Sequence, residues 1–347
     1  MWHSLLLILL GHLISSSVFI GTSAQLFNGT NHSELSGVNS NQDFSGSGLD
    51  ALPTSNQTVD PSSMIPKEFS AQFTQDLTRA IYALSTYITA LLAMIAISAE
   101  DFAAYYAGGE YTFKSYADVQ INIYSANSPT DPLKACHAIY GLQVAVYSIS
   151  TMDAWYETSI TLYWSRDGIK LPVGYIKIAL VTGGSNLTLG LANATQGPGI
   201  QPYLLGLPNS TDLLGQDIDT FENVRVTISP TFGGERLTLQ EVFLTLMLAV
   251  TIIAQHAVVQ WVEPFNIKDT TTLDTEFEYQ AIAPPRAQPP YFQYAYAALA
   301  LRILPQAMFH TGKLEDVEFT VNVDGIPVGI GFLKRVEDSS ASLVGTL

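Results

Sequence analysis

Apolar and polar residues alternate on both sides of two Asp-Gly turns. The second turn shows the pattern most clearly, because apolar residues occupy every other position before and after it. These apolar positions are Val317, Phe319, Val321 and Val323 before the turn, and Ile326, Val328, Ile330 and Phe332 after it. A period of two places one face of a strand against a core. Asp-Gly between two such runs predicts a hairpin with a type I′ turn, which needs positive φ at both central residues.

The same hairpin pattern occurs twice in the chain. Asp167, Gly168 and Ile169 match Asp324, Gly325 and Ile326, and a Pro-Val-Gly sequence follows each turn at residues 172–174 and 327–329. The alternative is that two unrelated hairpins share a common turn dipeptide. The shared Pro-Val-Gly favours an internal duplication, which is a signature of repeated structural units.

Two long apolar stretches precede these hairpins. A helical pattern runs from Thr74 to about Ala107, and a second begins at Thr238 with Glu241 in a capping-box arrangement and continues to about Val262. Residues 80–99 and 243–262 contain no Lys, Arg, Asp or Glu. A helix that is apolar all round is buried in a protein or in a membrane. We interpret both as buried helices, because no Lys or Arg cluster flanks them, and keep transmembrane helices as the alternative.

Between each long helix and its hairpin, the sequence predicts one or two strands and a second helix. Residues 111–124 read as a strand pair or one long strand, and a helix is expected from Asp131, with Pro132 at its first position, to about Ser150. In the second half, a strand passes through Phe277 and Tyr279. A helix from Tyr291 to about His310 should follow, kinked at Pro305 and capped by Gly312.

The fold class predicted from this order is α+β. The chain should contain two tandem αβαββ repeats, each a long apolar helix, a strand, a helix and an Asp-Gly β-hairpin. One unit alone could not cover so apolar a helix, so we expect the two repeats to pack as a pseudo-dimer. Residues 69–181 form repeat 1 and residues 237–337 form repeat 2 in this scheme.

The remaining segments read as targeting and surface segments. Residues 1–24 resemble a secretory signal peptide ending at Ala24, although the n-region is weak. Residues 25–68 are rich in Ser, Asn, Gly and Thr, which predicts a disordered, glycosylated arm. Residues 182–236 are expected to be a glycosylated linker with an extra strand at about 221–228 that could pair with either repeat. Residues 338–347 form a tail.

Six Asn-x-Ser/Thr sequons support a eukaryotic secretory route. All of them fall in the arm and the linker: Asn28, Asn31, Asn56, Asn186, Asn193 and Asn209. Glycans are bulky and belong on surface loops. The sequence therefore predicts a secreted, extracellular glycoprotein.

Composition narrows the classes of function. Cys136 is the only cysteine, so the chain is free of intrachain disulfides and depends on its core. The net charge is −16 with 15 Lys and Arg against 31 Asp and Glu. This acidic balance argues against nucleic acid and against anionic membrane surfaces.

The sequence contains no recognised catalytic motif, and a zinc site built from cysteines is impossible with one Cys. The scattered candidates for acid and base chemistry are Glu100, Asp101, His137 and His256. An alternative interpretation makes Glu100 and Asp101 a solvated turn and both histidines hydrogen-bonded structural residues. Cys136 and His137 are adjacent, but helix neighbours point about 100° apart, so adjacency alone makes no dyad.

The function expected from these observations is binding without catalytic machinery. The ligand would be an apolar small molecule, a lipid or a protein partner, and we expect no cofactor and no metal site. Aromatic residues crowd both halves, including Tyr163 and Trp164, and we interpret them as core rather than as a ligand surface. Two alternatives stay open: a cofactor-independent secreted isomerase, cyclase or hydrolase with an apolar cavity, and a membrane-embedded protein using helices 80–99 and 243–262.

Overall fold

The computed structural model describes residues 57–59, 64–113, 116–126, 131–181, 219–221, 224–269, 273–283 and 290–336. The protein is α+β, and the described residues form four helices and two sheets. They divide into two compact units: the described residues between 66 and 181 belong to unit 1, and residues 57–59, 64–65 and those between 219 and 336 belong to unit 2. The predicted signal peptide and the asparagines of all six sequons lie outside the described residues, although Gln57 and Thr58 of the Asn56 sequon form part of a described strand, Gln57–Val59.

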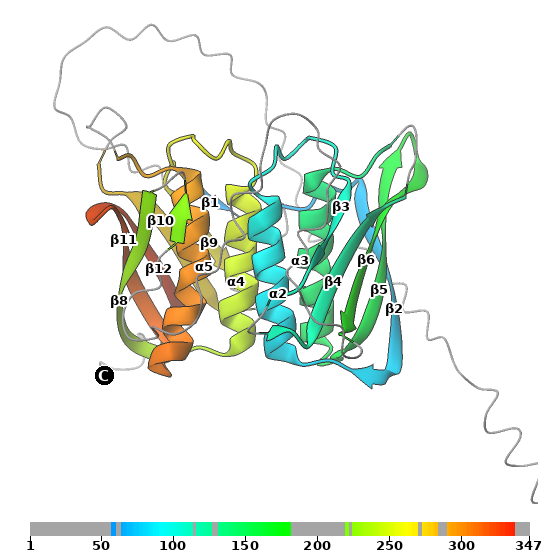
Figure 1. Cartoon of the computed structure of the whole chain (residues 1–347), viewed down its shortest axis with the longest axis horizontal. Coiled ribbons are helices and arrows are strands. Elements are labelled where there is room, and N and C mark those ends of the chain that lie inside the picture. Colours follow the sequence, from blue (N-terminus) through cyan, green and yellow to red (C-terminus); the bar gives the residue numbers. More distant parts are fainter. Residues whose placement is uncertain are drawn as a thin grey trace, which may run out of the picture. The chain divides into compact units, whose positions relative to one another are not determined.

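Unit 1 is a five-stranded antiparallel sheet with two helices on one side (Figure 1). Its elements in chain order are β2 (Phe69–Ala80), α2 (Ala83–Ile97), β3 (Gly108–Tyr111), β4 (Val119–Ser125), α3 (Ala135–Thr151), β5 (Tyr156–Arg166) and β6 (Ile169–Leu180). The strand order across the sheet is β2-β5-β6-β4-β3. α3 packs on β2, β5 and β6, and α2 packs on β4 and α3.

Unit 2 contains a sheet of seven strands and two helices. Its elements are β1 (Gln57–Val59), β7 (Asp219–Phe221), β8 (Val224–Arg236), α4 (Leu239–Ile253), β9 (Phe265–Asp269), β10 (Thr275–Ala281), α5 (Tyr294–Thr311), β11 (Glu315–Val323) and β12 (Ile326–Arg335). Five antiparallel strands follow the order β8-β11-β12-β10-β9, and the three-residue strands β7 and β1 add to the two ends.

Both hairpins form where the sequence predicts them. Asp167 and Gly168 have φ of 52° and 77°, and Asp324 and Gly325 have φ of 50° and 80°, as a type I′ turn requires. Each hairpin also contains a register shift at the same place. Leu162 and Tyr163 of β5 pair with Gly174 and Pro172, which leaves Val173 of β6 as an extra residue, and Val321 and Asn322 of β11 pair with Gly329 and Pro327, which leaves Val328 of β12 as an extra residue.

The Pro-Val-Gly sequence places a glycine where no side chain fits. A Cβ atom on Gly174 would lie 2.7 Å from Cδ1 of Leu133, and one on Gly329 would lie 2.5 Å from Cε1 of Phe292. Leu133 and Phe292 both lie just before the second helix of their unit. In both hairpins the valine carbonyl oxygen, of Val173 or of Val328, also accepts a backbone N–H at a distance of 3.0 Å.

Several predicted boundaries are wrong. Residues 74–80 belong to β2 rather than to a helix, because their backbone pairs with β5 through Asp76 opposite Glu157. Each unit therefore begins with a strand, and the order is βαββαββ rather than αβαββ. The extra strand is β8, which is longer than predicted and pairs with β11 in unit 2. One strand was expected through Phe277 and Tyr279, but two adjacent strands are present. These are β10, which contains both residues, and β9, which pairs with it.

The helix ends also differ from the prediction. α3 begins at Ala135 with Lys134 as its N-cap, because residues before it are extended: the Tyr106 N–H bonds the Leu133 carbonyl, and Lys134 bridges Tyr105. α4 ends at Ile253, before the predicted Val262, because the chain turns there: the Gln255 N–H donates to the Ile252 carbonyl and the His256 N–H to the Ile253 carbonyl. Beyond these turns, the Val262 N–H donates to the Phe292 carbonyl. Among the helices in the described residues, none combines the length and the apolar character needed to cross a bilayer.

Other local predictions are confirmed. Thr238 and Glu241 form the predicted capping box at the start of α4. Pro305 lies inside α5, and Gly312 is its C-cap with φ of 67°. These features depend on a few neighbouring residues, so they can be predicted without knowing how the sheet pairs.

The close contacts of Gly174 and Gly329 predict matched effects on stability. Replacing either with Ala should lower the free energy of unfolding by about 1 to 3 kcal/mol, because the added methyl group displaces Leu133 or the Phe292 ring. Gly233→Ala is the control, since no atom lies within 4 Å of the position that its methyl group would take. Urea unfolding measures all three. Equal stability of Gly174→Ala and Gly233→Ala would contradict the contact.

Candidate functional site

The acidic candidates of unit 1 form a surface turn after α2. Glu100 and Asp101 are both exposed. The Asp101 carboxylate accepts the Ala103 N–H at 2.9 Å, which closes the turn locally. The chain then lies against the start of α3, where the Cys136 N–H donates to the Phe102 carbonyl at 3.0 Å. The structure therefore gives Asp101 a structural partner.

His137 lies in an aromatic cluster on the first turn of α3. It is 4% exposed, and its ring centroid lies 4.9 Å from that of Trp164 and 6.4 Å from that of Phe69. Burial, with the Lys134 charge as a second cause, lowers the pKa of His137 to about 4. Nδ1 accepts the Lys134 N–H at 3.3 Å. This assigns the proton of the neutral ring to Nε2, so the ring caps the helix and has no free basic nitrogen.

Cys136 is held as a neutral thiol. Burial raises its pKa, and the charge of Lys134 offsets this in part. A thiolate is the reactive form of cysteine. With His137 also neutral, the neighbouring pair lacks the ion pair that activates a cysteine nucleophile.

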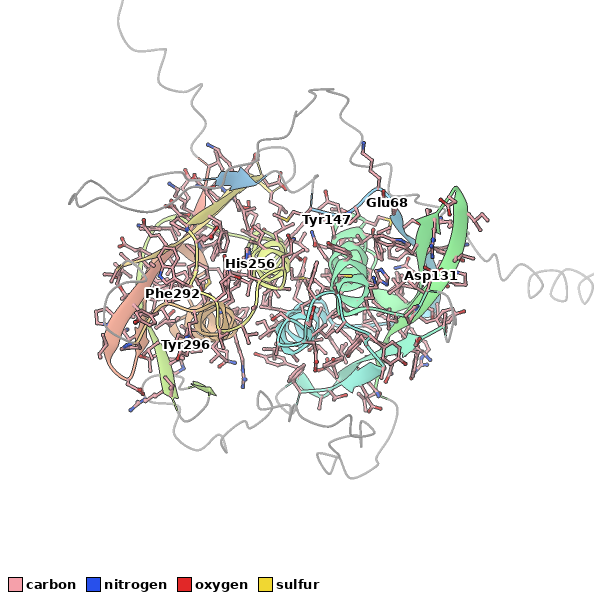
Figure 2. All side chains as sticks on the ribbon, turned by 90° about the horizontal axis from the view of Figure 1, so that it is seen from above. Glu68, Asp131, Tyr147, His256, Phe292 and Tyr296 are labelled. Carbon is pink, nitrogen blue, oxygen red and sulfur yellow. The ribbon has the colours of Figure 1, made fainter. Side chains whose placement is uncertain are left out.

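His256 lies in unit 2, in the turn after α4, close to the start of α5 where Phe292 and Tyr296 are labelled in Figure 2. Its ring stacks on Tyr294 with centroids 4.2 Å apart and an interplanar angle of 3°. Burial lowers the pKa of His256, while the Glu263 charge acts in the opposite direction. Glu100, Asp101 and His137 belong to unit 1, so neither unit holds all four candidates.

Two half-buried tyrosines, Tyr106 and Tyr111, form a pair that the sequence analysis treats only as aromatic content. The hydroxyl groups of Tyr106 and Tyr111 are hydrogen-bonded to each other. Burial is the main cause that raises both pKa values, that of Tyr111 to about 12, and the Glu100 charge adds to it. Both phenols therefore stay protonated. Within the described residues, no group of three or more His, Cys, Asp or Glu side chains could hold a metal ion.

The most exposed aromatic residues of the unit 1 sheet lie on the side away from its helices. Gly141 of α3 lies against Ile176 and Leu162, which fixes the covered face. Because successive residues of a strand point to opposite faces, the residues next to Ile176 and Leu162 in the sequence, and those directly opposite them on neighbouring strands, point away from α3. They include Tyr124 and Tyr175, which are 53% and 42% exposed. We call Tyr124, Tyr163 and Tyr175 the tyrosine face.

The tyrosine face spans three adjacent strands. Tyr124 of β4 is directly opposite Tyr175 of β6, and Tyr175 is directly opposite Thr161 of β5. Tyr163 lies two residues further along β5. Its hydroxyl donates to the side-chain Oε1 of Gln72 at 3.1 Å, and the Lys170 ammonium lies 4.8 Å from its ring centroid. Tyr163 is half-buried on this outer face, so the prediction that it belongs to the core is wrong.

Comparisons with known proteins leave the family open. No protein-family model and no curated protein matches the sequence. A solved structure of a protein from Thermobifida fusca, proposed to be a thioesterase II, is 11% identical, with 79% of this chain and 94% of that chain covered. The TM-score is 0.11, which is too low to support any argument from it.

The depressed pKa of His137 predicts a pH dependence of stability. An unfolded His takes up a proton below its ordinary pKa of 6.5, whereas the folded His137 does so only near 4. The free energy of unfolding should therefore fall as pH drops through this window, by about 3 kcal/mol from this residue. In His137→Asn the side chain does not titrate, yet its oxygen can accept the Lys134 N–H.

Urea unfolding at about pH 7 and about pH 4.5 measures this difference. The wild type should lose more stability than His137→Asn between the two values. The exposed His310→Asn variant serves as a control and should behave like the wild type. The same loss in the wild type and in His137→Asn would show that His137 is not the cause.

Proposed function

We propose that this protein is a secreted, extracellular glycoprotein that acts by binding, without catalytic machinery, through the tyrosine face of unit 1. The observation that carries the proposal is the exposure of Tyr124 and Tyr175 side by side on a sheet face that the described helices of unit 1 leave open. Aromatic residues supply much of the energy at interfaces and are favoured where one end is apolar and the other is wet. The secretory route rests on the sequons and on the apolar N-terminus.

The state of the acid and base candidates favours binding over an enzyme. The Asp101 carboxylate accepts a backbone N–H, His137 uses Nδ1 to cap α3, and His256 is stacked on Tyr294. Catalytic acids and bases need a pKa near the working pH and access to the reacting group. His137, with a pKa of about 4 and 4% exposure, has neither property.

We further propose that units 1 and 2 are tandem repeats of one ancestral domain. Their strand orders support this, since β2-β5-β6-β4-β3 corresponds element by element to β8-β11-β12-β10-β9. The register shifts at Leu162 and Val321 and the close contacts of Gly174 and Gly329 add local support. Shared irregular features argue for common origin more strongly than a shared fold, because a sheet of this kind can form without them.

A pseudo-dimer is the arrangement we propose for the two repeats. α2 has no charged residue, and its main contacts with the described elements of its own unit are with α3 and β4. α4 is similarly apolar after Glu241. Helices that are apolar all round need cover on every side.

Limited proteolysis followed by size-exclusion chromatography tests the pseudo-dimer. A variant that begins at Met64 and is cut by a protease within residues 182–218 should elute as one complex, whereas two separate folded fragments would contradict the pseudo-dimer.

Native mass spectrometry tests the binding function. The protein should be recovered from the medium of a secreting eukaryotic host and treated to remove N-glycans. The wild type should carry additional non-covalent mass, and the Tyr124→Ala, Tyr175→Ala double variant should lose it. Ile326→Ala, at another exposed apolar residue in unit 2, is the matched control and should retain it. Protein that carries no bound mass, or a double variant that retains it, would contradict the proposal.

A further inference from the structure

We infer that the tyrosine face binds an extended, neutral carbohydrate chain. This inference rests on the proposed binding function and names the ligand class for the same site. Three features of the face carry it: the aromatic rings, their absence from the matching positions of unit 2, and the mainly neutral hydrogen-bonding groups in line with Tyr124 and Tyr175.

The rings provide a platform for the apolar faces of sugars. Tyr124 and Tyr175 lie on adjacent strands in directly opposite positions, so their Cβ atoms are about 5 Å apart and their rings can act together. Tyrosine offers a large, rigid and amphipathic contact at a low cost in conformational entropy. Tyr163 extends the platform, and its orientation is set by Gln72 and Lys170. Sugar rings carry C–H groups on their faces and hydroxyl groups at their edges, which matches this combination.

The fold itself does not require aromatic residues at these positions. In unit 2 the pair that corresponds to Tyr124 and Tyr175 is Gln280 and Ile330, which are likewise directly opposite on β10 and β12. The unit 2 counterpart of Tyr163 is Asn322, because each is the first residue after the register shift of its strand. It donates to Ser229 at 3.1 Å, where Tyr163 bonds Gln72. The same sheet is thus built with and without the rings, so sheet stability does not explain them.

The groups in line with Tyr124 and Tyr175 are mainly neutral donors and acceptors, whereas Tyr163 lies beside the charged Lys170. The row that crosses the sheet through both rings contains no charged residue and consists of Gln72, Thr161, Tyr175, Tyr124 and Gly108. The next row contains Thr74, Ser159, Lys177, Asn122 and Glu110, where the one positive and one negative charge cancel.

This neutrality stands out in a chain with a net charge of −16. Nucleic acid would require a basic surface, and an anionic polysaccharide would be repelled by the acidic protein as a whole. A lipid would require exposed aliphatic side chains, and neither row contains one. Amide and hydroxyl groups beside aromatic rings suit the hydroxyl groups of a neutral sugar chain.

Isothermal titration calorimetry with the full chain tests the inference. The probes are cellohexaose, chitohexaose, laminarihexaose and maltohexaose, which differ in linkage and substituents but are all neutral. At least one should bind the wild type. Tyr124→Gln and Tyr175→Ile, which introduce the unit 2 residues, should each weaken that binding by about tenfold. Tyr175→Phe retains the ring and should retain most of the affinity.

Ile330→Ala in unit 2 is the matched control and should leave the affinity unchanged. Thermal unfolding checks that each variant folds. Gln and Ile are chosen as the replacements for Tyr124 and Tyr175 because unit 2 has these residues at the matching positions of its sheet. Absence of binding by all four probes, or unchanged affinity in both tyrosine variants, would overturn the inference. If mass spectrometry then finds a non-carbohydrate ligand that Tyr124→Ala and Tyr175→Ala remove together, the binding function stands and only the carbohydrate assignment fails.

Discussion

The close approach of each hairpin to the residue before the second helix determines much of the structure. Leu133 occupies the space beside Gly174, and Phe292 occupies the space beside Gly329, so a side chain is excluded at both glycines. This contact fixes which face of the strand meets the helices. Since successive residues of a strand point to opposite faces, Tyr175 must then point away from the helices, and so must Ile330 in unit 2. The packing of the core thereby also determines which residues the outer face presents.

The sequence predicts well those features of the fold that depend on interactions between neighbouring residues. The Asp-Gly turns, the Thr238 and Glu241 capping box and the Gly312 cap each depend on a few adjacent residues, and all are present. The failures involve pairing over long distances. β2 joins a sheet through β5, and nothing in residues 74–80 reveals that partner. Similarly, α3 starts three residues after Pro132, which was predicted to be its first residue. The residues before α3 are instead hydrogen-bonded to the loop that follows α2.

The candidate site was harder to predict than the fold. Sequence alone identifies His137 as a titratable residue in an apolar helix, but not that Phe69 and Trp164 enclose it. The tyrosine face was missed because aromatic residues were assigned to the core as a class. A signal was present: Tyr124 follows Val119, Ile121 and Ile123 in the opposite phase, which places it on the outer face. Only the pairing of β4 with β6 shows that Tyr124 and Tyr175 meet there.

The most direct test of this account is nuclear magnetic resonance of the protein with isotope-labelled tyrosine, titrated with the neutral hexasaccharide that binds. The account predicts that ring signals of Tyr124 and Tyr175 shift together and saturate, while those of the buried Tyr279 and Tyr294 in unit 2 remain unchanged. Assignment follows from the signals lost in Tyr124→Gln and Tyr175→Ile. Shifts confined to the tyrosines of unit 2, or saturation without any change at Tyr124 and Tyr175, would contradict a binding site on the unit 1 sheet.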